Sequence, residues 1–317
     1  MRYRAFLLLI LLLILLAAST SSPAMALLVL KNWLRSALPL APLSLAAALI
    51  ISCGQIDIAS GAAFSFVGMI VVAWTHAYGS EGTAVAWLIG WSAVVVFYFL
   101  MYFIVVVGRV PALLCTIGMA LAGQSISLLL QAYVNRSAVS LPGSQQSGGL
   151  TVPLTGLGAF DFSGVWTILI VGLLVLWRYR SNAGLDHIAV GMDPRAARIA
   201  GINTKVIYLS AFIASGILVG LSSLLFMVGV QLGGWATNVG WGKELFAIAA
   251  AVIGGCRITG GRFDPVCILL ATVLVFGVRD ITNALNLPLE LDYLVLGTGV
   301  ILVALIDRGR PSADLRA

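Results

Sequence analysis

Charge is scarce in this 317-residue chain: only 9% of its residues are Asp, Glu, Lys or Arg, while 61% are hydrophobic. Repeated apolar runs of roughly 17 to 25 residues exceed what a soluble core needs and match repeated crossing of a bilayer. No room remains for a separate soluble domain of roughly 100 residues or more. We therefore predict an all-α polytopic membrane protein in a lipid bilayer, with no nucleic acid partner. Any ATP hydrolysis must then belong to another chain.

Metal-binding side chains are also few. The four cysteines lack a paired spacing such as C-x-x-C, so we interpret them as small apolar packing residues. They are Cys53, Cys115, Cys256 and Cys267. The two histidines, His76 and His187, are too far apart to suggest a zinc site, and neither belongs to an H-E-x-x-H arrangement. We expect neither a metal site nor a cofactor.

A nucleotide-binding loop is missing as well. Residues 254–263 carry two glycine pairs, but Walker A requires a Lys followed by Ser or Thr after its second glycine, and this chain has Gly-Arg-Phe there. The glycine pairs instead favour tight turning and close helix approach at a cytoplasmic turn.

Ten apolar segments, separated by charges, glycines or prolines, are predicted to cross the membrane. They are residues 5–22, 37–53, 61–78, 84–107, 111–131, 163–178, 206–230, 244–257, 265–286 and 290–306. Several are short, notably 244–257, so we expect spans there that are tilted, broken or buried by their neighbours. We expect residues 1–317 to form a single transmembrane domain.

Lysines and arginines set the orientation. With Met1 inside, most of them fall on the cytoplasmic side, as the positive-inside rule predicts, and ten crossings leave both termini in the cytoplasm. Those left outside are Lys31, Arg35, Arg136 and Lys243. The alternative for the N-terminus is a cleaved signal peptide, because Arg2, the Leu-rich run 7–16 and residues 23–26 resemble its basic, apolar and small-residue zones. Cleavage would leave nine spans.

Residues 178–205 form a charged island between apolar segments, so they must meet water. Asp193 followed by proline starts a helix there, since Asp caps free amide groups and proline at the first helical position loses no hydrogen bond. Gly201 is predicted to stop this helix after roughly two turns, with Arg195 and Arg198 exposed. Charge asymmetry places the island in the cytoplasm.

The loop 132–162 is neutral and rich in glycine, serine and glutamine. We place it on the periplasmic face, where it is either a contact for a solute-carrying partner or a plain linker between two spans.

Polar residues interrupt the apolar runs at 52–61 and at Arg279-Asp280. Irregular backbone at membrane depth survives only where protein or a water-filled cavity satisfies it. Asp57 is thus a helix-capping anchor at a broken helix, which we favour, or a residue lining a polar path. Arg279 and Asp280 are adjacent on a helix and so poor partners for each other, and we expect each to pair across helices.

Four motifs in a fixed order resemble the permease subunit of bacterial ABC importers of the ribose and simple-sugar type, over most of residues 45–308. This family also includes autoinducer-2 permeases, with nucleoside and branched-chain amino acid permeases as more distant relatives. The motifs are residues 54–61 (similar to G-G-I-D-L-S-x-G), 109–119 (similar to (K/R)-(I/V)-P-x-F-I-x-T-L-G-M), 189–202 (similar to A-x-G-x-N-x-x-A-A-x-x-x-G-I), and 244–255 with 259–262 (similar to E-L-x-A-I-A-A-V-V-I-G-G and x-G-G-x).

The resemblance implies transport across the bacterial inner membrane. Two permease subunits, identical or different, enclose the path, two ATPases dock on the cytoplasmic face, and a periplasmic solute-binding protein delivers a small solute. The island would carry the coupling helix, which nucleotide-driven closure of the ATPases displaces. Its implied ATPase-coupling residues are Asp193, Pro194, Arg195, Ala196, Ala197, Arg198 and Gly201.

Residues at the broken helix or along the path are implied on the same grounds. They are Gly54, Gln55, Asp57, Ser60, Gly61, Gln124 and Glu244. Three positions depart from the family pattern: Gln55 replaces a glycine, Ala59 replaces a serine, and Gln124 stands where arginine is frequent. If these residues face the path, the solute differs from ribose.

Two other classes of function stay open. A membrane-embedded enzyme would need a clustered acid, base or metal set, and its candidates, Asp57, Glu244 and Asp280, have no nearby histidine. A secondary transporter or channel would import its solute without ATP and without partners.

Overall fold

The computed structural model describes residues 7–14, 23–78, 83–139, 159–230, 237–284, 288 and 290–308, and these are helical with short connections and contain no strand. Residues 7–14 are helical, while the rest of the predicted first span lies outside the described residues. The other elements are α2 (Pro23–Ala37), η1 (Leu38–Leu40), α3 (Ala41–Ser52), α4 (Ser60–Tyr78), α5 (Thr83–Tyr102), η3 (Phe103–Val107), α6 (Ala112–Val139), α7 (Ala159–Arg180), α8 (Asn182–Met192), α9 (Pro194–Ile199), α10 (Thr204–Val230), α11 (Lys243–Ile253), α12 (Pro265–Ala284) and α13 (Glu290–Arg308).

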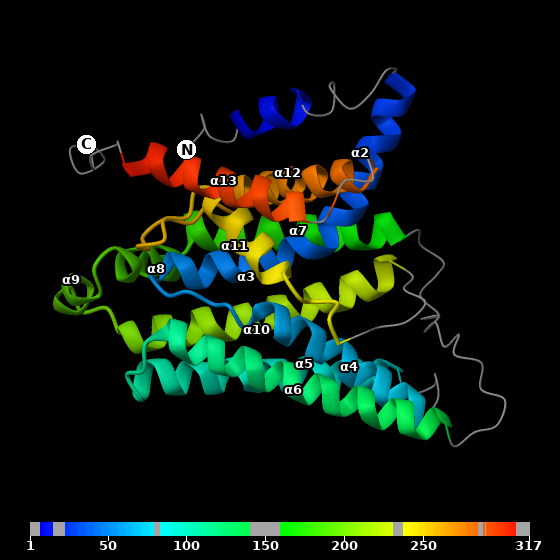
Figure 1. Ribbon diagram of the computed structural model, residues 1–317. Helices are drawn as coiled ribbons and strands as arrows, with labels where there is room; N and C mark the ends of the chain where they lie inside the picture. The colour runs from blue at the N-terminus through cyan, green and yellow to red at the C-terminus, as the bar shows by residue number, and fades with distance from the viewer. Residues whose placement is uncertain are drawn as a thin grey trace.

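Helix α3 forms the centre of the bundle. Every residue from Ala41 to Ser52 is buried, and the helix packs against α10, α11 and α12. A helix that is apolar on all sides has no solvent-facing stripe, so it is stable only when neighbours or lipid surround it. Figure 1 shows α3 and α11 between two flanks, one formed by α5 and α6 and the other by α12 and α13.

Six helical stretches within the described residues are long and apolar enough to cross a membrane. They are Met25–Ser52, Ser60–Tyr78, Thr83–Val107, Ala112–Asn135, Thr204–Met227 and Pro265–Asn283. A seventh arises if Gly164–Arg180 and Asn182–Met192, which meet at a bend of 77°, are one broken span. The all-helical membrane class is therefore confirmed, at six or seven candidate spans by length and composition.

The boundaries differ from the sequence prediction at three places. The segment expected to begin at residue 37 belongs to a helical stretch from Met25 to Ser52, because prolines in the first positions of η1 and α3 need no amide partner. The segment 244–257 is the 11-residue helix α11, too short to cross roughly 30 Å of hydrocarbon. The predicted loop 132–162 is helical at both ends, and its residues 140–158 lie outside the described residues.

Side-chain caps begin helices α8 and α12. The Ser181 hydroxyl accepts a hydrogen bond from the amide of Gly184 at 3.1 Å and so begins α8. Asp264 similarly accepts from the amides of Val266 and Cys267 at the start of α12, both at 3.2 Å. Each cap satisfies amides that a helix start leaves without intrahelical partners.

Candidate functional site

The break between α3 and α4 is held by Asp57. Its side chain is 1% exposed, and its carboxylate accepts hydrogen bonds from the Ala59 amide at 2.7 Å and from the Tyr98 hydroxyl at 2.6 Å. Gly54 provides the turn out of α3, with a φ of 77° that favours glycine. These contacts fit the anchor interpretation of Asp57, because the carboxylate fastens the start of α4 to α5.

The start of α11 lies against the start of α4. A Cβ on Gly61 would meet Glu244 Oε2 at 1.9 Å and the Gly240 carbonyl oxygen at 2.6 Å, so only glycine allows this approach. The amide of Gly240 donates to the Ser65 hydroxyl at 2.7 Å. Both α4 and α11 thus begin inside the bundle, where their first turns lie against each other.

Glu244 provides a buried acceptor at this meeting point. Its Oε1 accepts from the Gly242 amide at 3.2 Å, whereas Oε2 has no hydrogen-bond partner among the described residues. The hydroxyl of the buried Ser60 is likewise without a partner there. Lys243 donates its ammonium to the Val239 carbonyl and lies 4.9 Å from the Phe226 ring centroid. Polar groups of this kind are costly inside a membrane protein and point to function.

A tight backbone junction joins two of the sequence motifs to the end of α3. The Ser52 carbonyl at the end of α3 accepts a hydrogen bond from the Gly261 amide at 2.8 Å. A Cβ on Gly191 would meet that same carbonyl oxygen at 1.9 Å, and one on Gly260 would meet the Gly191 carbonyl oxygen at 2.4 Å. We name the contact between Ser52, Gly191, Gly260 and Gly261 the glycine junction. It packs the end of α8 against the end of α3 and the α11–α12 turn.

His187 fastens the glycine junction with its side chain. Its Nε2 lies 2.7 Å from the Ser52 hydroxyl oxygen, and the ring is 1% exposed. Trp177 and Phe263 pack around the imidazole, with ring centroids 5.2 and 6.5 Å away. Nothing in the sequence pattern points to this packing role of His187, because Ser52 lies 135 residues away. Among the described residues no group of three His, Cys, Asp or Glu is placed to hold a metal.

Helix α9 projects from the bundle beside this junction (Figure 1). The Asp193 carboxylate accepts from the amides of Arg195 and Ala196 at 2.8 and 3.1 Å, and these hydrogen bonds hold its pKa below the usual value. The helix ends at Ile199, whose side chain is 89% exposed, and Gly201 follows in the left-handed region at φ 86°. The predicted start is confirmed, and the six residues of α9 are the roughly two turns expected before Gly201.

The sequence prediction overlooked α8, an 11-residue helix that precedes α9. The two predicted docking arginines also differ. Both are exposed, as expected, but Arg198 also donates its Nε–H to the Thr204 hydroxyl at 3.0 Å, at the start of α10, and Arg195 does not. Ala197 is buried against the body of the protein, while Ala196 is exposed.

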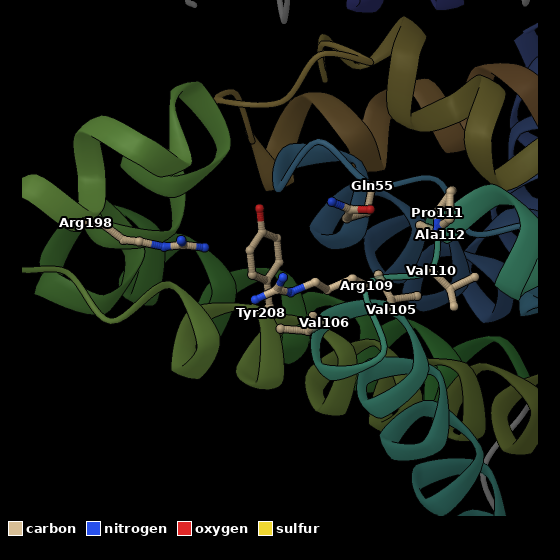
Figure 2. Close-up of a pocket in the computed structure, with 9 residues that line it drawn as sticks. All are labelled: Gln55, Val105, Val106, Arg109, Val110, Pro111, Ala112, Arg198 and Tyr208. Carbon is tan, nitrogen blue, oxygen red and sulfur yellow. The ribbon is translucent and has the colours of Figure 1, made fainter.

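Gln55 lines a pocket of about 340 Å³ on the side of α9 opposite the glycine junction. Arg109, Arg198 and Tyr208 also line it, and Figure 2 shows the two guanidinium groups pointing toward each other from opposite sides of the tyrosine. The Gln55 amide lies against the Tyr208 hydroxyl. Gln55 is therefore separated from the meeting point of α4 and α11.

The other intramembrane candidates are dispersed. Gln124 is half-buried on α6, and among the described residues no hydrogen bond joins it to the α3–α4 break. Arg279 pairs across helices with Asp292 of α13, Nε to Oδ2 at 4.0 Å, as expected. Asp280 interacts with Ser36 of α2, so each member of this adjacent pair does find its partner on another helix.

These features define a multi-pass membrane protein built from broken helices with a projecting helix at one end. Over residues 29–305 the chain matches the family described as branched-chain amino acid transport system / permease component. Because this match covers most of the chain, the protein belongs to that family. It is a transporter permease and not an enzyme.

Curated relatives carry related descriptions. The chain is 26% identical over 290 residues to the galactofuranose transporter permease protein YtfT of Escherichia coli strain K12, covering 87% of this chain and 79% of that one. It is 29% identical over 159 residues to the L-arabinose ABC transporter permease protein AraH of Azospirillum brasilense, covering 49% and 46%. It is 27% identical over 207 residues to the autoinducer 2 import system permease protein LsrC of Salmonella paratyphi B, covering 64% and 56%. No solved structure matches. The resemblance inferred from the four motifs is thus confirmed.

Proposed function

We propose that the protein is the permease subunit of an ATP-driven importer that moves a small solute of the sugar class into the cytoplasm. Relatives named for galactofuranose and L-arabinose transport support the solute class. The partners would be cytoplasmic ABC ATPases, a periplasmic solute-binding protein and a second permease subunit, identical or different. The chain would lie in the bacterial inner membrane as a multi-pass protein with both termini in the cytoplasm.

The observation that supports this proposal best is the position of α9. It is a capped helix with exposed Arg195 and Ile199, and it follows directly on the glycine junction. A rigid helix attached to the bundle in this way transmits its displacement to the adjacent spans. Close-packed backbone cannot absorb such a movement by local rearrangement. We assign the ATPase contact to Asp193, Pro194, Arg195, Ala196, Ala197, Arg198 and Gly201.

Charge reversal tests the ATPase contact. Arg195→Glu is expected to weaken recovery of the cognate ATPase with the solubilised permease and to abolish ATP-dependent uptake, while Arg180→Glu, also at an exposed arginine of this end, leaves both in place. Equal recovery and uptake for the two variants would contradict the assignment. Uptake by proteoliposomes that lack ATP and partners would instead identify a secondary transporter or channel.

We assign the solute path to the meeting point of α4 and α11, with Asp57, Ser60, Gly61 and Glu244 nearest to it. Gln55 lies in the pocket beside α9 and Gln124 on α6, so neither is assigned to the path, and Gly54 provides the turn out of α3. The Glu244 Oε2 atom supports this, because a buried acceptor with no partner suits the hydroxyl donors of a sugar. Glu244→Gln is expected to reduce uptake with ATPase assembly intact. Glu290→Gln, at the start of α13, is the control; a Glu244→Gln variant with undiminished uptake would remove Glu244 from the path.

A further inference from the structure

The pocket beside α9 is cationic. Arg109 and Arg198 enter it from the α5–α6 turn and from α9, and neither forms an ion pair within the part of the chain that the structure describes. Arg198 is held by Thr204 through Nε alone, which leaves its terminal nitrogens directed toward the pocket. Arg109 has a left-handed backbone, φ 56°, directly after the π-helical turn η3. Such a conformation is rare for a residue with a side chain and is found where a side chain must be presented in one direction.

Lipid-facing helices form one rim of the same pocket. The turn that carries Arg109 joins two candidate membrane spans, α5 with η3 and α6. Large apolar side chains near this turn are exposed, among them Val107 (49%), Leu113 (44%) and Leu114 (63%). The pocket wall continues this surface through Val106 and Val110. Because the turn ends two spans, the pocket lies at the depth of the lipid headgroups.

We propose that this pocket binds the phosphate of an anionic phospholipid headgroup. Two guanidinium groups that face each other suit a phosphodiester, which accepts paired hydrogen bonds from each and relieves their repulsion. Gln55 and Tyr208 offer polar contacts to the headgroup glycerol, and the acyl chains lie along the exposed faces of α5 and α6. Basic pockets between spans at the cytoplasmic side bind such headgroups in other membrane proteins.

This binding site does not depend on the importer function, since it requires only that α5 and α6 cross a membrane. Its position has a consequence for the moving parts of the protein. One bound headgroup would touch the α3–α4 break through Gln55, the α5–α6 turn through Arg109 and helix α9 through Arg198. The lipid would therefore tie α9 to two spans on the side opposite the glycine junction.

Lipid titration of the full chain in detergent, read by native mass spectrometry, tests the proposal. At high salt, where diffuse surface charge contributes little, phosphatidylglycerol is expected to bind about 30-fold more weakly to the Arg109→Gln/Arg198→Gln variant than to the unmodified protein. The control is Arg180→Gln/Arg257→Gln, which removes two exposed arginines outside the pocket with the same change of net charge. It is expected to bind as the unmodified protein does.

Further measurements distinguish a lipid headgroup from free inorganic phosphate as the ligand. Phosphatidylcholine is expected to bind all variants equally weakly, and inorganic phosphate is expected not to displace phosphatidylglycerol. Arg109→Lys/Arg198→Lys, which keeps the charge, should retain more lipid than the glutamine variant, and equal melting temperatures without lipid show that all variants fold. Equal loss in the control, or displacement of the lipid by inorganic phosphate alone, would overturn the proposal.

Discussion

On one side of α8 and α9 the Gly191 backbone packs directly against Ser52, whereas on the other side Arg198 borders a pocket of about 340 Å³. The two regions are close together in the sequence. Ser52 belongs to the glycine junction, and Gln55, three positions later, lines the pocket. The junction has no space even for a methyl group. The pocket has space for an occupant, and its two arginines, which form no ion pair with any described residue, carry the charge to attract one.

This difference indicates that the segment formed by α8 and α9 has two roles, packing on one side and binding on the other. Backbone contacts without side chains between them make α8, α3 and the α11–α12 turn move as one body. Side chains around a cavity allow relative movement, which an occupant would restrict. Substitutions in the junction should therefore affect folding, and those in the pocket should affect binding.

Gly191→Ala should produce the largest effect. The added Cβ would meet the Ser52 carbonyl oxygen at 1.9 Å and the Gly261 amide nitrogen at 2.7 Å, and backbone atoms cannot rotate away. We expect the free energy of unfolding to fall by about 3 kcal/mol, measured by thermal melting in detergent. The control is Gly172→Ala on α7, where a Cβ meets nothing within 4 Å. If the two variants melt alike, the junction is not tightly packed.

Tyr98→Phe should produce the second-largest effect. The change removes the hydroxyl that donates to Asp57 Oδ2 at 2.6 Å and leaves a buried carboxylate oxygen without that donor. A loss of about 2 kcal/mol in unfolding free energy is expected. Tyr102→Phe serves for comparison, because Tyr102 is also buried and contacts Phe212 through its ring. A Tyr98→Phe variant as stable as Tyr102→Phe would show that Asp57 does not need this anchor.

Gln55→Gly should change stability less. The position faces the pocket, so no packing is lost, and the added backbone freedom costs about 1 kcal/mol or less. Chemical unfolding in detergent gives the measurement, with Gln55→Ala as a variant that keeps a Cβ. A loss as large as that of Gly191→Ala would mean that the pocket region is packed like the junction.

Asp193→Ala should have the smallest effect on the whole fold. The cap acts on α9 alone, so we expect faster amide hydrogen exchange in residues 195–199 with the melting temperature unchanged. The Asp193 pKa is lowered below its ordinary 3.8 because the amides of Ala196 and Arg195 donate to the charged form. The cap is therefore fully present above that ordinary value and is lost as pH falls through the lowered pKa. Protection that persists after the substitution would rule out the cap.

Much of the candidate site was predictable from the sequence. The capped start of α9 and the break at Asp57 depend on neighbouring residues and on short hydrogen bonds, so local pattern suffices to find them. Span boundaries were less predictable. Apolar length alone does not distinguish a helix that crosses the bilayer from a short one such as α11, which its neighbours bury.

The long-range contacts that complete the site could not be predicted from the sequence. Tyr98 lies in an apolar run with no pattern that points to Asp57, 41 residues earlier, and His187 lies 135 residues from Ser52. Gly191 belonged to a recognised motif, but nothing in the motif indicates what it must touch. The pairing of Arg109 with Arg198 could not be predicted either, because each arginine by itself looks like an ordinary surface charge.

The sequence by itself determined the membrane class, the water-exposed island with its capped helix, and the family, because composition, local caps and motif order need no knowledge of distant contacts. Only the tertiary structure decided that Glu244 meets Gly61, that glycines of α8 and of the α11–α12 turn meet the end of α3 in one junction, and that two arginines share one pocket. The physical reason is that apolar helix faces offer many similar docking surfaces. Close backbone approach and a few buried polar contacts select one arrangement among them.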